Sequence, residues 1–268
     1  MKTICSFFVT ILILLVFSGC GGSDHEKAKI NYGMSSYEKK SAVCDSTGCA
    51  KIVLVYPEIK RAFNEAAKDS LMNYIKSALL DNYFQQKRTK SLDEMTELFL
   101  KDYENTRTEF VDYSLPWEIN STVSVIYNAS SIVSFQSEFY HFTGGAHGMS
   151  GIYFANFNSQ DGKRLTLSDL LVSGFEKELN RIADKLFRKD KDLSPDANLD
   201  EAGFWFEGNK FSLNGNFGIK NHGLVFYFNS YEIAPYAMGP TEIIVPYKEI
   251  KSLVKSDGLL RKVIVELN

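Results

Sequence analysis

Residues 123–139 read VSVIYNASSIVSFQSEF, and this stretch decides the fold class. Apolar residues alternate with others on both sides of its centre, at Val123, Val125, Tyr127, Val133, Phe135 and Phe139. A period of two predicts β-strands, and Asn128-Ala129-Ser130 predicts the hairpin connection between them. The stretch is therefore expected to be an antiparallel pair.

The segments on either side of this hairpin alternate between strand and helix patterns. Towards the N-terminus, strands are expected between Ile30 and Val55, and an amphipathic helix from Phe63 to Tyr83. Ser91 and Glu94 form a capping box at the start of a second helix. Towards the C-terminus, the pattern predicts strands at 152–157, 211–213, 224–228 and 241–245, and helices at 176–188 and 247–254.

This order of elements predicts an α+β fold. Antiparallel sheets should pack against two long helices in the N-terminal half and one further helix. We expect a lipoprotein signal peptide at 1–19, a tether at 20–29, an N-terminal α+β part at 30–142 and a C-terminal α+β part at 143–268.

The first twenty residues indicate export and lipid attachment. Lys2 precedes an apolar run from Phe7 to Phe17, which is too short to cross a membrane comfortably. Phe17-Ser18-Gly19-Cys20 resembles a lipobox, so Cys20 is the predicted lipidation site; a plain signal peptide cleaved nearby is the alternative. We expect an extracytoplasmic protein held at a membrane of the cell envelope.

The charge balance argues against nucleic acid as a partner. The net charge is -3, and it becomes -4 when residues 1–19, with the single cation Lys2 and no acid, are removed. A mildly acidic chain without a basic block has no electrostatic footprint for nucleic acid. Aromatic residues make up 13% of the chain, which favours a folded protein.

Cys44 and Cys49 enclose the turn-forming sequence Asp-Ser-Thr-Gly. In an oxidising compartment we expect them to form a disulfide that closes a short loop. A metal site and a redox centre are weaker readings, because ligand-rich sequence and a Cys-x-x-Cys spacing are both absent nearby.

Two segments are unusual enough to be candidate sites. The first is HFTGGAHG (141–148), where Gly144 and Gly145 suggest positive φ angles and His147 follows directly. His141, His147 and His222 could hold a metal, but a tight hairpin is the simpler reading, and no metal or catalytic residue is predicted. The second is YEIAPYAMG (231–239), whose Tyr231 and Tyr236 either fill a core or form an exposed binding surface.

These segments carry a family resemblance. Gly144-Gly145-Ala146-His147, Leu165–Leu170, Tyr231–Ala237 and Val245-Pro246-Tyr247 occur in this order. The pattern resembles the extracytoplasmic domain pair of the lysozyme-sensing anti-sigma-V factor (the RsiV type), which also precedes polysaccharide-deacetylase domains. The resemblance implies an α+β fold and a binding role, with lysozyme or peptidoglycan as ligand.

The chain differs from these family members in the segments that accompany the domain pair. We recognise no sigma-binding segment, spanning helix or deacetylase motif in the sequence, so a stand-alone lipoprotein is expected. The leading hypothesis is a non-enzymatic envelope-binding module without a cofactor, with Gly144, Gly145, His147, Tyr231 and Tyr236 as candidate ligand-binding residues. An envelope hydrolase that uses His147 and a purely structural lipoprotein remain alternatives.

Overall fold

The computed structural model describes residues 29–45, 48–80, 89–110 and 115–266. The predicted signal peptide, Cys20 and the tether up to residue 28 lie outside these residues. The first half comprises β1 (Asn31–Lys40), β2 (Ala50–Arg61), α2 (Glu65–Leu80), α3 (Leu92–Glu109), β3 (Trp117–Ala129), β4 (Ile132–Phe142), β5 (Met149–Asn158) and β6 (Arg164–Leu165). The second comprises α4 (Leu167–Leu170), α5 (Glu176–Asp190), η1 (Glu207–Asn209), β7 (Phe217–Lys220), β8 (Gly223–Phe228), η2 (Tyr236–Met238), β9 (Thr241–Pro246), η3 (Tyr247–Glu249) and α6 (Leu259–Glu266).

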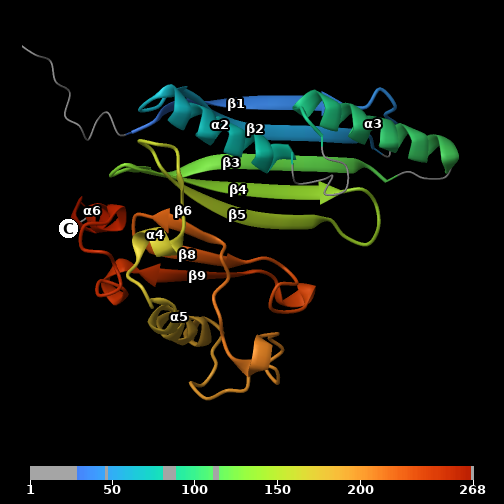
Figure 1. Ribbon diagram of the computed structural model, residues 1–268. Coiled ribbons are helices and arrows are strands. Elements are labelled where there is room, and N and C mark those ends of the chain that lie inside the picture. The colour runs from blue at the N-terminus through green and yellow to red at the C-terminus, as the bar shows by residue number, and fades with distance from the viewer. Residues whose placement is uncertain (1–28, 46–47, 81–88, 111–114, 267–268) are drawn as a thin grey trace, which may run out of the picture.

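The strands form one sheet of six, in the order β1-β2-β3-β4-β5-β6, and one of three, in the order β7-β8-β9. Helices α2 and α3 lie along the large sheet, and the small sheet lies on its other side with α5 beyond it (Figure 1). The predicted α+β class is confirmed. One pair, β2 with β3, is parallel, because α2 and α3 form the crossover between them.

The expected hairpin at 128–130 is confirmed, with Ala129 opposite Ile132 at its tip. Ser91 caps α3 as predicted, since its side chain accepts a hydrogen bond from the Glu94 backbone N–H at 3.1 Å. Glu94 closes the cap by accepting from the Lys90 N–H at 2.7 Å. No helix within the described residues is both long and apolar enough to span a membrane.

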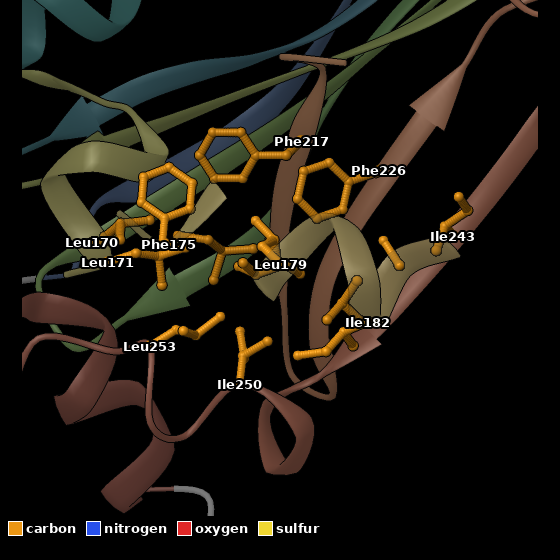
Figure 2. Packing of buried hydrophobic residues seen from close by; sticks show 14 of the residues in the cluster. Leu170, Leu171, Phe175, Leu179, Ile182, Phe217, Phe226, Ile243, Ile250 and Leu253 are labelled. Carbon is orange, nitrogen blue, oxygen red and sulfur yellow. The ribbon is translucent and has the colours of Figure 1, made fainter. Parts of the chain in front are cut away.

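Each face of the large sheet covers its own core. On the helix-bearing face, Leu71 and Ile75 of α2 and Phe99 and Tyr103 of α3 are buried in one cluster with Phe135 of β4. The second cluster joins the small sheet to α5, to α6 and to the segment around η3. Figure 2 shows its centre, where Phe217, Phe226, Phe175, Leu179 and neighbouring aliphatic side chains pack together.

Asparagine side chains join the two sheets. Strand β5 pairs with β6 only at Asn156 and Phe157, so most of its outer edge has no neighbouring strand. The Asn216 amide accepts a hydrogen bond from the Phe154 N–H at 2.9 Å and donates one to the Ile152 carbonyl at 2.8 Å. Asn216 thus replaces one residue of a missing strand, and the edge is closed to further pairing.

Two further asparagines extend this joint. The Asn229 side chain accepts a hydrogen bond from the Ile152 N–H at 2.7 Å. The buried Asn156 side chain donates to the Phe217 carbonyl at 2.8 Å and accepts from the Ile219 N–H at 3.0 Å. Strands β5 and β6, which follow residue 142, therefore belong to the large sheet and also carry its contacts to the small one.

Two predicted elements are wrong. Residues 211–213 are not a strand: Phe211 and Leu213 pack against the second core, and the Leu213 N–H donates to the Asn180 side chain at 2.7 Å. Residues 247–254 form the short η3 and turns, and the terminal helix is α6. Both segments have apolar spacing that suits burial without regular hydrogen bonding, which a periodicity pattern alone cannot distinguish.

Candidate functional site

The turn that connects β4 to β5 has the conformation predicted from its glycines. Gly144 and Gly145 have φ angles of 94° and 93°, and a Cβ atom on Gly145 would meet nothing within 4 Å. A Cβ on Gly148 would lie 2.4 Å from the Tyr140 ring, so glycine is needed there for close packing. The turn therefore holds a compact shape that leaves the intervening His147 exposed.

The segment from Tyr231 to Gly239 is anchored at its middle and exposed at both ends. Ile233 and Ala234 are buried, and the Ile233 carbonyl accepts a hydrogen bond from the Trp205 N–H at 2.8 Å. Tyr231 and Tyr236 are 50% and 40% exposed. The sequence left core and surface roles open for the two tyrosines, and the structure places both at the surface.

The two candidate segments meet. The rings of His147 and Tyr236 are stacked with their centroids 4.3 Å apart and their planes at 15°. The Tyr231 ring lies next to Tyr236, with centroids 5.5 Å apart. We call His147, Tyr231 and Tyr236 the aromatic patch. Its three amphipathic rings share a rigid frame, the composition that favours recognition of a partner.

The patch has little of the geometry that acid–base or metal chemistry requires. Nδ1 of His147 lies 2.9 Å from the Gly148 carbonyl, and no Asp or Glu of the described residues pairs with this ring. His141 lies on β4, stacked on Phe139, and burial lowers its pKa. His222 lies in the β7–β8 turn. Across the described ranges, no group of three or more His, Cys, Asp or Glu residues is placed to hold a metal.

Cys44 and Cys49 flank the Asp45–Gly48 bridge, as two separate thiols. Asp45 and Gly48 exchange both backbone hydrogen bonds, at 3.2 and 3.3 Å. This isolated bridge lies between the two cysteines in the sequence and draws the chain on its two sides together. A hydrogen bond with Cys49 raises the pKa of Cys44. The disulfide remains a prediction that this geometry suits.

The sequence did not single out a second group of aromatic residues. Phe139 and Tyr153 stack across β4 and β5, with ring centroids 6.1 Å apart and planes at 7°. Both fit the ordinary alternation of a strand, so their pattern is that of core residues. Only the register between β4 and β5, which pairs Phe139 with Gly151 and Ser137 with Tyr153, shows that the two rings are neighbours.

The fold and the patch together define a two-sheet α+β module with an exposed aromatic surface. Its two halves match two different family models. Residues 43–150 match the model described as "Deacetylase PdaC", and residues 168–248 match "Protein of unknown function (DUF3298)". The N-terminal half is thus similar to a PdaC deacetylase-associated domain, and the C-terminal half is similar to a DUF3298 domain.

Curated proteins and solved structures agree with this arrangement. The chain is 25% identical over 173 residues to the peptidoglycan-N-acetylmuramic acid deacetylase PdaC of Bacillus subtilis, covering 63% of the chain and 33% of that protein. It is 34% identical over 62 residues to the immunogenic protein MPT64 of Mycobacterium tuberculosis, covering 23% of each. The chain therefore spans a third or less of the length of these relatives.

Two crystal structures of the DUF3298 family share the fold. The protein from Bacteroides fragilis superposes with a TM-score of 0.72 at 20% identity, over 88% of this chain and 98% of that one. The protein from Pseudomonas aeruginosa gives a TM-score of 0.66 at 21% identity, over 85% and 95%. At these identities the likeness establishes the architecture.

Proposed function

We propose that the chain is a non-enzymatic binding module of the cell envelope, of the RsiV-like type, that is anchored to a membrane through lipidated Cys20. It captures lysozyme or peptidoglycan on the outer side of that membrane. The observation that carries the binding role is the aromatic patch, where His147, Tyr236 and Tyr231 form a contiguous exposed surface.

Three features support an envelope location. The lipobox-like sequence around Cys20 supplies an anchor, and a fully processed lipoprotein with several acyl chains is held firmly. The curated relative of Bacillus subtilis is named for a peptidoglycan substrate, which supports a location beside the cell wall. A spacing of cysteines suited to a disulfide agrees with an oxidising compartment.

The patch suits a macromolecular ligand. Aromatic side chains supply a large contact area at low entropic cost, and interface centres are enriched in them. Ile233 and Ala234 fix the segment beneath the two tyrosines, so the surface is pre-organised and little ordering is needed on binding. The net negative charge also suits a basic protein such as lysozyme.

The test uses the mature chain with Cys20→Ser, which releases it from the membrane. We expect this protein to sediment with insoluble peptidoglycan or to bind lysozyme in a titration. Tyr236→Ala should weaken the binding of lysozyme at least about tenfold, as loss of a central aromatic contact does. Tyr32→Ala, which removes an exposed ring on the distant strand β1, is the matched control. Failure to bind either ligand with a folded protein would refute the proposal.

A hydrolase that uses His147 is the second candidate. The ring is exposed and lies in a glycine-rich turn, as reactive groups often do, but it lacks a described acidic partner. Activity on glycan, ester or peptide substrates that disappears in His147→Ala would favour the hydrolase over the binding module.

A further inference from the structure

A groove of about 770 Å³ lies on the helix-bearing face of the large sheet, and none of the residues that line it belongs to the aromatic patch. Helix α2, strands β4 and β5, Arg164 of β6 and the loop before β7 surround it. Ligand-binding clefts in proteins usually enclose about 300–1,000 Å³. The groove is therefore large enough for several linked rings.

The floor of the groove presents flat aromatic faces. The rings of Phe139 and Tyr153 are nearly parallel, and Tyr153 is 46% exposed. Gly151 makes this arrangement possible, because a Cβ there would lie 2.5 Å from the Phe139 ring. Sugar rings stack on such faces through their C–H groups, which are attracted to the negative face of the ring.

The wall formed by α2 contributes polar groups and a further ring. Tyr74 packs against Phe157 in the groove, with ring centroids 5.2 Å apart. Asn73 and Ser77 are exposed on the same helix and line the groove. Hydroxyl and amide groups of this kind bind the hydroxyl and acetamido groups of a sugar chain.

Arg164 adds a positive charge to the groove. Its guanidinium carbon lies 5.9 Å from the centre of the Tyr74 ring, and none of the lining residues is Asp or Glu. The neighbouring Lys163 pairs with Asp169 at 3.2 Å, whereas Arg164 has no ion-pair partner among the described residues. A guanidinium in this position is suited to bind a carboxylate of a ligand.

We propose that this groove binds an amino-sugar chain that carries a carboxylate. Phe139 and Tyr153 stack on the sugar rings, Asn73 and Ser77 bond their polar groups, and Arg164 pairs with the carboxylate. The inference rests on the proposed function only for the sugar class, since N-acetylmuramic acid carries such a carboxylate wherever no stem peptide is attached to it. It assigns the glycan to the groove and leaves the aromatic patch to the protein ligand, lysozyme.

The test titrates the mature chain with Cys20→Ser with two tetrasaccharides, by calorimetry. One alternates N-acetylglucosamine and N-acetylmuramic acid and is free of peptide; the other is chitotetraose, which has the same ring and acetamido chemistry without carboxylates. We expect the muramyl chain to bind at least about tenfold more tightly, because a charged bidentate pair is worth more than about 1.4 kcal/mol.

Single substitutions then separate the contributions of individual side chains to sugar binding. Arg164→Gln should remove the preference for the muramyl chain, and Tyr153→Ala should weaken both sugars. Tyr32→Ala, the control that lies outside the groove and the patch, should change the binding of neither sugar. Equal binding of both sugars by the wild type, or no effect of either groove variant on a folded protein, would overturn the proposal. Loss of binding in Tyr236→Ala alone would instead place the glycan on the patch.

Discussion

The imidazole ring of His147 lies against the phenol ring of Tyr236, with centroids 4.3 Å apart. The two residues belong to the β4–β5 turn and to the segment before β9, so the contact links the large sheet to the small one at the surface. It makes one surface of two sequence motifs that are far apart in the chain.

The first prediction concerns the energetic coupling of these two rings. His147→Ala and Tyr236→Ala should each change the free energy of unfolding by less than about 1 kcal/mol, since both side chains are exposed. A double-mutant cycle in urea should give a coupling of about 0.5–1 kcal/mol, the value of an aromatic pair. If the effects of the two single substitutions on the free energy of unfolding simply add in the double mutant, the stacked rings contribute nothing to stability.

The second prediction concerns the asparagine joint. Asn156→Ala should lower the free energy of unfolding by about 1–3 kcal/mol, because it leaves the buried Phe217 carbonyl without its partner. Asn73→Ala, at an exposed position of α2, should change it by less than about 0.5 kcal/mol. Urea unfolding of the two variants checks the difference, and equal stability would contradict a structural role for Asn156.

The third prediction compares two glycines. A Cβ on Gly223 would lie 2.2 Å from the Val245 carbonyl oxygen, which belongs to the backbone and cannot move aside cheaply. Gly223→Ala should therefore cost about 3 kcal/mol or more, or prevent folding. Gly215→Ala meets nothing within 4 Å and should be tolerated. Thermal unfolding distinguishes them, and a fully stable Gly223→Ala would contradict the packing of β8 on β9.

The fourth prediction concerns pH. The Thr166 backbone N–H and hydroxyl, followed by Lys163, lower the pKa of Asp169 from 3.8 to about 2. Because the pKa is lower in the folded state, the charged carboxylate stabilises the fold above pH 4, and this contribution is lost as the pH falls towards 2. Asp169→Asn should cost about 1 kcal/mol at pH 7, as loss of a helix cap does, and almost nothing near pH 2. If Asp169→Asn lowered the free energy of unfolding equally at pH 7 and pH 2, the charge of Asp169 would have no stabilising role.

The fifth prediction concerns the two thiols. Air-oxidised mature protein should show no reactive thiol at Cys44 and Cys49, because the Asp45–Gly48 bridge and the hydrogen bond between the two thiols hold them close together. Replacing both by serine should lower the free energy of unfolding by about 2 kcal/mol, the chain-entropy value for so short a loop. Thiol labelling and mass spectrometry check the bond, and free thiols after oxidation would rule it out.

Local patterns predicted most of the elements because their causes are local. Alternation defined β3 and β4, and Ser91 with Glu94 defined the start of α3, since a cap involves neighbouring backbone groups only. The same reasoning failed at Phe211 and Leu213, where burial against the second core replaced strand pairing. Periodicity reports which side chains are buried, and it does not report where their backbone hydrogen bonds go.

The sequence by itself determined the α+β class, the positions of α2, α3, α5 and the β3–β4 hairpin, the positive φ angles at Gly144 and Gly145, and the two candidate motifs. Tertiary structure alone decided that His147 stacks on Tyr236, that β2 runs parallel to β3, and that asparagines close the edge of β5. It also placed Phe139, Tyr153 and Arg164 around one groove. These contacts join residues distant in the chain, and their free energy depends on the register and packing of both partners, which no local pattern contains.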